Sequence, residues 1–346
     1  MNIAEIDKNF AESYSFDGLK TYDIEQPPFR LFGLFREAGE KDYKRLPHTV
    51  VEEIGNNGYR SLYKNTSGIR LRFKTDSQRI VLTCRLPGFT RHDNMPRTAS
   101  SCFDMYADGH YCKVFRPSED LSGTFSSEHN FGSRKMRDIL INFPLYNPVD
   151  EVYISLEEGA NIVPCDDYKQ QKPTVYYGSS ITQGGCASHP GNCYCSIISR
   201  RMDADFVNLG FSGSARGELA MADYIGGLSM HAFVYDYDYN APTVAHLQET
   251  HEPFFKHFRQ YQPTTPVIMV SRANEIGTKE TRQRRDIIRT TYENALAAGD
   301  KNVYFIDGSE IYKAVGLDYC TVDCVHPNDL GFLCMANTIG AVLERL

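Results

Sequence analysis

The sequence contains no tryptophan and no apolar run of the length that a membrane-spanning helix requires. A bilayer-spanning helix needs roughly 18 consecutive apolar residues, so we expect no membrane association. The first residues, MNIAEIDKNFAES, also lack the basic start and apolar core of a secretory signal, and we expect a cytoplasmic protein. Because tryptophan is absent, any stacking on a ring-shaped ligand falls to the 22 tyrosines and 20 phenylalanines.

Positively charged residues are fewer than negatively charged ones. The chain has 37 lysines and arginines against 44 acidic residues, for a net charge of −7, which disfavours nucleic acid as a partner. The one basic cluster lies in a helical pattern, and we expect it to form a solvated helix face. It consists of Arg282, Arg284, Arg285 and Arg289.

The ten cysteines lack the paired C-x-x-C spacing of structural zinc sites. In a chain of 346 residues without a secretory signal, we expect them to be mostly reduced and buried. Cys186, Cys193 and Cys195 lie close together, which leaves a metal site as an alternative. The expectation is that no metal and no organic cofactor is bound.

The first half of the chain has the pattern of a β-sandwich. Apolar and polar residues alternate within 68–75, 79–86, 101–115 and 151–156, and turn residues such as Asn56-Asn57-Gly58 separate such runs. No convincing helical pattern lies among them. The polar, proline-bearing stretch 157–173 is typical of a linker. We therefore predict a sandwich domain with its linker over residues 1–165.

The second half, 166–346, alternates apolar runs with helical patterns. The runs lie at 174–178, 205–210, 232–237, 266–271 and 302–307, and the clearest helical patterns lie at 243–262, 278–298 and 328–346. This alternation predicts a five-stranded parallel sheet between two layers of helices. In such sheets, function lies at the carboxyl ends of the strands.

Several candidates for chemistry lie there. Ser179 and Ser180 follow the first run in "VYYGSSITQGG", a strand–turn–helix pattern that presents a nucleophile in several hydrolases. A hydroxyl nucleophile needs a base and an orienting carboxylate. Among the ten histidines, only His326 has an aspartate, Asp323, three residues before it.

An oxyanion needs hydrogen-bond donors besides the N–H of the nucleophile. Gly213 follows the second run and offers a bare backbone N–H, and Asn240 follows the third run and offers a side-chain amide. Each of these residues is also common in ordinary turns.

In this order the four blocks resemble the SGNH (GDSL-type) hydrolases over roughly residues 172–346. The resemblance implies a three-layer, flavodoxin-like α/β domain with Ser180 as nucleophile, His326 as base and Asp323 as orienting acid. It also implies an oxyanion hole formed by Ser180, Gly213 and Asn240. Two departures from the family pattern are present: Ser179 replaces the usual aspartate of the first block, and "DYDYN" replaces the common G-x-N-D around Asn240.

The stretch "SCFDMYADG" resembles the G-x-D-L-Y motif of a bacterial SGNH subgroup with an N-terminal, jelly-roll-like sandwich. This resemblance implies carboxylic-ester hydrolysis, and we expect an acetyl esterase acting on acetylated oligosaccharides. A short-chain lipase or thioesterase and a non-catalytic carbohydrate-binding protein with a vestigial site are the alternatives. We expect the sandwich to shape the rim of the site or to mediate homo-oligomer formation.

Overall fold

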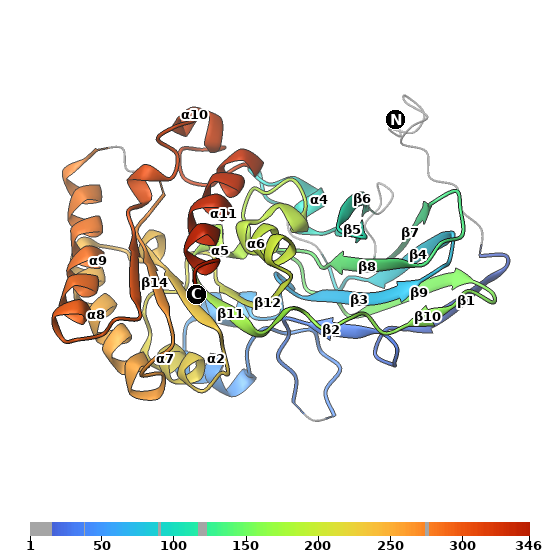
Figure 1. Cartoon of the computed structure of the whole chain (residues 1–346), viewed down its shortest axis with the longest axis horizontal. Helices are drawn as coiled ribbons and strands as arrows, with labels where there is room; N and C mark the ends of the chain where they lie inside the picture. The colour runs from blue at the N-terminus through green and yellow to red at the C-terminus, as the bar shows by residue number, and fades with distance from the viewer. Residues whose placement is uncertain (1–15, 38, 89–90, 117–122, 274–276) are drawn as a thin grey trace.

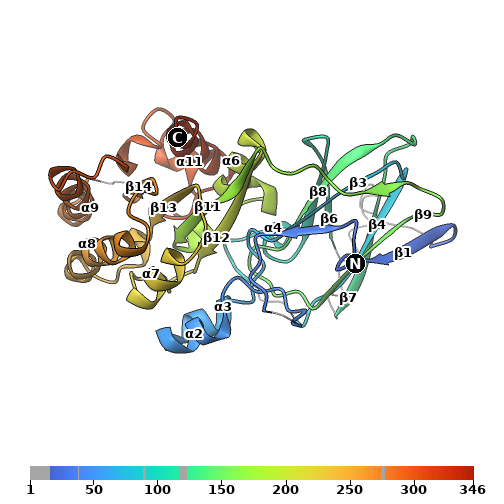
Figure 2. The same cartoon turned by 60° about the horizontal axis from the view of Figure 1, so that its bottom comes forward.

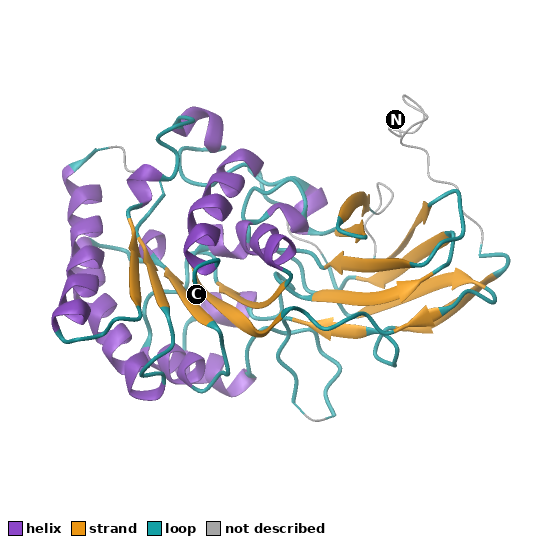
Figure 3. Cartoon of the chain, in the orientation of Figure 1, coloured by secondary structure: helices purple, strands orange, loops and turns teal. Residues whose placement is uncertain are grey.

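The computed structural model describes residues 16–37, 39–88, 91–116, 123–273 and 277–346. Its two halves differ in architecture, as Figure 1 shows, with a helix-flanked sheet on the left and a strand-rich body on the right. Figure 3 shows that most helices gather around the sheet of the second half. This arrangement confirms the predicted fold class: a parallel α/β domain preceded by an all-β domain.

The first half contains two antiparallel sheets that enclose a core of aliphatic and phenylalanine side chains. One has the strand order β1-β9-β4-β7 and the other has the order β10-β3-β8-β5-β6, with β2 also paired to β3. The strands are β1 (Leu19–Asp23), β2 (Arg30–Phe32), β3 (Arg70–Thr75), β4 (Arg79–Arg85), β5 (Phe103–Ala107), β6 (His110–Phe115), β7 (Thr124–Asn130), β8 (Arg137–Asn142), β9 (Glu151–Glu157) and β10 (Ile162–Val163).

Three short helices interrupt the described part of this half, so the expectation of strands alone was wrong here. They are α2 (His48–Ile54), α3 (Asn57–Leu62) and α4 (Arg97–Ser100). Asn56, which was expected in a turn, caps α3 by accepting the Gly58 N–H at 2.8 Å. Helix α2 contacts a helix of the second half, α7 (Leu219–Gly226), and Figure 2 shows α2 beside it. Tertiary burial stabilises these helices, which are too short to show a clear periodicity.

The second half is built on a parallel sheet with the strand order β12-β11-β13-β14-β15. Its strands are β11 (Gln170–Gly178), β12 (Ala204–Gly210), β13 (Ala232–Asp236), β14 (Val267–Val270) and β15 (Val303–Ile306). They lie at the predicted apolar runs because a parallel sheet is buried on both faces and needs apolar residues throughout. Strand β11 begins four residues earlier than the run at 174–178.

Helices cover both faces of this sheet. One apolar cluster includes side chains of α7, α8 (Val244–Tyr261) and α9 (Lys279–Ala297), and another includes side chains of α6 (Tyr194–Met202) and α11 (Asp329–Leu343). The shorter elements are α5 (Ser180–Gln183), α10 (Leu317–Cys320), η2 (Pro190–Asn192), η3 (Asp238–Asn240) and η4 (Gly308–Glu310).

The predicted linker is docked along the sandwich. Strand β10 pairs with β3 inside this stretch. Asp166 forms an ion pair with Lys74 at 2.6 Å, and Asp167 forms one with Arg30 at 2.7 Å. The polar residues of this linker stretch therefore include charges that pair with side chains of the sandwich strands.

A buried arginine of the first half joins the two halves. The Arg45 guanidinium donates to the carbonyls of Asn208 at 3.2 Å and Gly210 at 2.6 Å, at the end of edge strand β12. It also lies over the Phe211 ring, 4.4 Å from the ring centroid. Burial lowers the pKa of Arg45 to about 9. The sandwich thus covers the end of a sheet edge that would otherwise expose unpaired carbonyls.

Candidate active site

The two adjacent serines have different environments. Ser179 is fully buried, and its hydroxyl caps α5 by accepting the Ile181 N–H at 3.2 Å. Ser180 is the first residue of α5, so its side chain projects from the turn that follows β11. Gly178 is required at the strand end, because a Cβ there would lie 2.3 Å from the Asp236 carbonyl oxygen. Both serines are largely buried, Ser180 being 9% exposed, so they differ mainly in that the helix cap uses the hydroxyl of Ser179.

Ser180, His326 and Asp323 form a continuous hydrogen-bonded chain. Ser180 Oγ lies 2.9 Å from His326 Nε2, and His326 Nδ1 lies 2.8 Å from Asp323 Oδ2. Nδ1–H can donate to the carboxylate in this arrangement, which leaves Nε2 free to accept the hydroxyl proton. The structure brings these three predicted residues together although the serine and the histidine are 146 positions apart.

The Asp323 carboxylate accepts four hydrogen bonds. Oδ1 accepts the backbone N–H groups of Val325 at 3.2 Å and His326 at 2.7 Å. Oδ2 accepts His326 Nδ1 and also the side-chain amide of Asn94, at 3.0 Å. Burial alone would raise the pKa of Asp323, but these bonds outweigh it and hold the pKa well below its ordinary value. Asp323 is therefore the ionised, acceptor member of the chain.

Gly213 and Asn240 lie at the same edge of the sheet as Ser180. The register pairs Gly178, at the end of β11, with Gly210 on β12 and with Asp236 on β13, so the loops that follow all three strands begin side by side. Gly213 has a φ of 65°, a conformation that favours glycine.

The two residues bind each other. The Gly213 N–H donates to Asn240 Oδ1 at 3.1 Å, while Asn240 Nδ2 donates to the Phe211 carbonyl at 2.9 Å. Among the described residues, Asn240 Nδ2 has this one acceptor, which leaves its second hydrogen for a ligand oxygen. A ligand oxygen would have to share the Gly213 N–H with Asn240.

The unusual sequence around Asn240 forms a buried ion cluster. Asp238 is fully buried, and its carboxylate forms ion pairs with Arg272 at 3.2 Å and Arg284 at 3.3 Å. Arg284 also donates to the Ala241 carbonyl at 3.0 Å. The expectation that Arg284 lies on a solvated face was wrong, because Asp238 provides the opposite charge that permits its burial. This cluster fixes the turn that carries Asn240.

The motif similar to G-x-D-L-Y binds the second half. Asp104, fully buried on β5, lies 2.6 Å from His189 Nδ1 through Oδ2, and the same oxygen accepts the Gly191 N–H. Its other oxygen accepts the Asn142 side chain at 2.7 Å. Tyr146, also from the first half, donates its hydroxyl to the Ser180 carbonyl at 3.0 Å. The sandwich thus contacts the nucleophile turn and the loop after it.

Sequence reasoning did not identify Asn94, Asp104 or Tyr146 as neighbours of the site. The G-x-D-L-Y resemblance marked Asp104 only as part of a motif. Asn94 and Tyr146 have no local pattern that distinguishes them, since their contacts form only when the two halves fold together.

The three clustered cysteines make separate contacts. Cys193 Sγ lies 3.2 Å from Ser196 Oγ, and Cys195 Sγ contacts the Thr182 carbonyl at 4.0 Å. Burial raises the pKa of Cys186 to about 12. Within the described residues, no group of three or more histidine, cysteine or acidic side chains is arranged to hold a metal ion. Each of the ten cysteines carries a thiol outside any disulfide bond.

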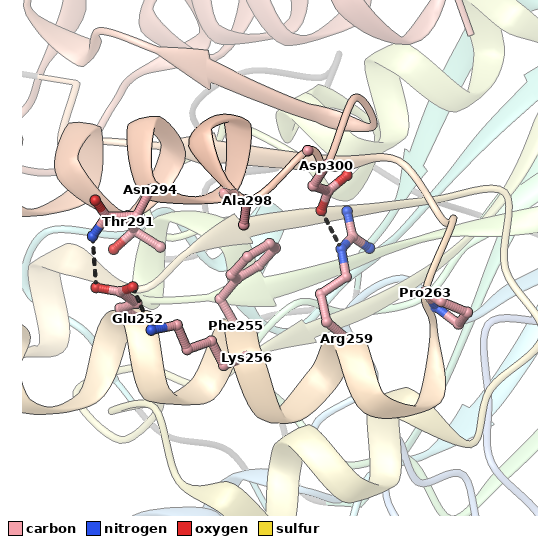
Figure 4. A pocket seen from close by; sticks show the side chains of 11 residues that line it. Glu252, Phe255, Lys256, Arg259, Pro263, Thr291, Asn294, Ala298 and Asp300 are labelled. Carbon is pink, nitrogen blue, oxygen red and sulfur yellow. Dashed lines mark hydrogen bonds and ion pairs between the residues drawn. The ribbon is translucent and has the colours of Figure 1, made fainter.

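A cavity of about 390 Å³ lies elsewhere, between α8 and α9 (Figure 4). Its charged side chains bind one another: Arg259 pairs with Asp300 at 2.7 Å, and Glu252 with Lys256 at 2.7 Å. None of the lining residues belongs to the candidate site. Across the described part of the chain, no helix is both long and apolar enough to span a bilayer.

Comparisons with solved structures show the same architecture over nearly the whole chain. A protein described as a GDSL-like lipase from Bacteroides ovatus ATCC 8483 is 26% identical, with a TM-score of 0.83, and the match covers 94% of this chain and 97% of that one. The salicylyl-acyltransferase SsfX3 from a tetracycline biosynthetic pathway is 18% identical, with a TM-score of 0.77 and coverage of 94% and 98%.

An acetyl xylan esterase, Est2A, from the rumen bacterium Butyrivibrio proteoclasticus is 12% identical, with a TM-score of 0.58 and coverage of 94% and 98%. At 18% and 12% identity, the similarities to SsfX3 and to Est2A show a shared fold alone. No curated protein matches the sequence.

Family models match both halves. Residues 19–162 match GxDLY, described as the N-terminus of Esterase_SGNH_hydro-type, and residues 171–344 match the GDSL-like Lipase/Acylhydrolase family. The second match covers half of the chain and contains the serine, glycine, asparagine and aspartate–histidine blocks. The chain therefore belongs to the GDSL-like lipase/acylhydrolase family and is an SGNH-type hydrolase.

Proposed function

We propose that this SGNH-type hydrolase is a serine esterase that removes O-acetyl groups from carbohydrates. The observation that carries the proposal is the unbroken chain from Ser180 Oγ through His326 to the Asp323 carboxylate, with distances of 2.9 and 2.8 Å. This arrangement is the one that activates a hydroxyl for acyl transfer.

In the first step, Ser180 Oγ attacks the acyl carbon while His326 Nε2 takes the hydroxyl proton. Asp323 keeps Nδ1 protonated and stabilises the imidazolium that forms. The carbonyl oxygen becomes an oxyanion, which accepts hydrogen bonds from the Ser180 N–H and the remaining amide hydrogen of Asn240. The Gly213 N–H turns from Asn240 Oδ1 toward this stronger, charged acceptor.

The second step releases the acyl group. His326 donates its proton to the leaving sugar oxygen as the ester bond breaks, and an acyl-enzyme remains. Water then gives a proton to His326 and attacks the acyl carbon. As the tetrahedral intermediate collapses, His326 returns this proton to Ser180 Oγ, and the acid leaves and ionises to the carboxylate. Apart from the substrate and the water, the groups used in both steps belong to this chain.

The acetyl and carbohydrate parts of the proposal have separate support. Among the proteins of similar fold are an acetyl xylan esterase and family two carbohydrate esterases, one of them in complex with cellohexaose. On this chain, Tyr319 lies four residues before Asp323 and is 65% exposed, so an aromatic face is available beside the loop that carries His326. Aromatic faces stack on sugar rings, and no tryptophan is present for this role.

The test is acetate release from a panel of acetylated oligosaccharides, with Ser180→Ala as the inactive control. A parallel series of simple esters from acetyl to octanoyl separates an acetyl esterase from a short-chain lipase or thioesterase. We expect the acetyl ester to be the best substrate of the series. Oligosaccharide binding without hydrolysis of any ester would instead indicate a vestigial site.

A further inference from the structure

A side chain of the N-terminal half contacts the carboxylate of Asp323. Asn94 lies in the segment between β4 and α4, and its Nδ2 donates to Asp323 Oδ2 at 3.0 Å. The two residues are 229 positions apart in the sequence. The other three donors to this carboxylate belong to the turn of residues 323–326 itself.

The backbone of the turn at residues 323–326 binds only the Oδ1 atom of the carboxylate. Both backbone donors bind Oδ1. Among the described residues, Asn94 is the one donor that shares Oδ2 with His326 Nδ1. Asp323 is 36% exposed, and its neighbours Val322, Cys324 and Val325 are exposed as well. Without Asn94, water would compete for Oδ2 and the carboxylate plane could rotate away from the imidazole.

The segment that carries Asn94 is itself anchored. The Asn147 side chain donates to the Gly88 carbonyl at 2.7 Å, and the Leu145 N–H donates to the Ala99 carbonyl at 3.0 Å. The His92 ring meets the Tyr146 ring edge to face at 5.2 Å, and the Tyr146 hydroxyl binds the Ser180 carbonyl. The segment therefore binds Asp323 directly through Asn94 and reaches the Ser180 turn indirectly, through Tyr146.

We propose that Asn94 is a positioning residue for the Asp323 carboxylate, so that the N-terminal domain completes the active site. The inference rests on the proposed function, because it assigns Asn94 a role only through Asp323 and His326. A fixed Oδ2 keeps the imidazole in the orientation in which Nε2 accepts the Ser180 proton. Asn94 touches no reacting atom, so its effect falls on turnover and leaves substrate binding unchanged.

The first measurement is steady-state hydrolysis of an activated aryl acetate by the full-length Asn94→Ala variant. We expect kcat to fall by roughly 3- to 30-fold, with KM within about twofold of wild type. This is less than the roughly 10- to 150-fold that the loss of a hydrogen bond to a charged group can cost, because Asp323 is 36% exposed and water can partly replace the amide. The matched control is Asn294→Ala. It removes a similar amide–carboxylate bond, 3.1 Å long, to Glu252 at the distant cavity, and kcat should not change.

A double-mutant cycle tests whether Asn94 acts through Asp323. In an Asp323→Asn background the carboxylate is absent, so Asn94→Ala should change kcat by less than about twofold. An equal fold-loss in both backgrounds would mean a general structural role and would overturn the inference. So would a wild-type kcat in the single variant.

Failure of this inference is distinguishable from failure of the proposed function. If Ser180→Ala and His326→Ala abolish hydrolysis while Asn94→Ala does not affect kcat, only the role of Asn94 is wrong. If Ser180→Ala and His326→Ala retain activity, the proposed mechanism is wrong, and the role of Asn94 falls with it.

Discussion

Replacement of Asp323 by asparagine tests the proposed mechanism at its most specific point. The change keeps the size of the side chain and replaces one acceptor oxygen with an NH₂ group that only donates. All four hydrogen bonds to Asp323 are donated to it. The asparagine amide can place its NH₂ group at the Oδ1 or at the Oδ2 position. In both cases the NH₂ group faces hydrogen-bond donors and cannot accept from them.

The structure indicates which orientation is adopted. With NH₂ at the Oδ1 position, the backbone N–H groups of Val325 and His326 would lose their acceptor. A backbone N–H can only donate, so neither group could form a hydrogen bond with the NH₂. With NH₂ at the Oδ2 position, His326 can respond by moving its proton from Nδ1 to Nε2 and accepting at Nδ1. We expect the second orientation, in which Nε2 carries a proton and cannot accept one from Ser180.

The expected loss of turnover follows from this change of the His326 tautomer. A wrong tautomer in a serine–histidine–aspartate arrangement lowers turnover by about 10⁴-fold. We expect a loss of roughly 10³- to 10⁴-fold here, smaller than that of His326→Ala, because an imidazole remains and its reactive tautomer stays accessible. The fold should be retained, since the backbone N–H groups keep an acceptor oxygen.

The assay is the initial rate of aryl acetate hydrolysis by wild type, Asp323→Asn and His326→Ala, with thermal unfolding of each as the check on folding. A rate for Asp323→Asn within about tenfold of wild type would refute the reasoning, because a reversed tautomer cannot be that active. The aspartate would then be structural, and another acceptor, such as a backbone carbonyl, would orient His326.

Three further predictions concern single side chains. Ser180→Ala should remove about 10⁴- to 10⁶-fold of turnover, whereas Ser179→Ala should cost only about 1 kcal/mol of stability through the lost helix cap; a serine-directed probe that labels Ser179 would contradict this assignment. Asn240→Ala should lower kcat by about 10²- to 10³-fold in steady-state assays with little change in unfolding temperature, and near-normal turnover would mean that another donor fills its place. His251 is fully buried against Thr291, and burial lowers its pKa to about 3, so the unfolded state binds one more proton below its ordinary pKa of about 6.5. The free energy of unfolding should therefore fall by up to about 1.4 kcal/mol per pH unit as the pH drops below that value, and urea titrations of His251→Gln should show a shallower dependence.

The sequence predicted those parts of the fold and site that are encoded locally. Apolar runs marked the five parallel strands because both faces of that sheet are buried. The D-x-x-H spacing placed Asp323 beside His326 because three residues suffice for a tight turn, in which the His326 N–H also binds the carboxylate. The assignment of Ser180 followed from its place after Gly178 at a strand end. The catalytic roles of these residues, and the domain boundary at 165, stay predictions.

The parts that were missed depend on contacts between distant segments. Arg284 lies in a charged helical pattern typical of a solvated face, and only the position of Asp238 makes its burial favourable. Helix α2 is seven residues long and is stabilised by contact with α7, so its own sequence carries little signal. Asn94 is an ordinary loop residue until the two halves meet.

Contacts between the two halves hold the loops of the proposed active site. Asp104 holds the loop at Gly191, Tyr146 holds the Ser180 carbonyl, and Asn94 holds Asp323, so the N-terminal half contacts the turns of both the serine and the aspartate. Catalysis by a serine–histidine pair depends on placement to within about 0.5 Å. Because the two turns lie in different parts of the second half, a body that binds both restricts their relative movement. Substitutions between residues 91 and 104 should therefore alter turnover at the proposed site even where they leave each half folded.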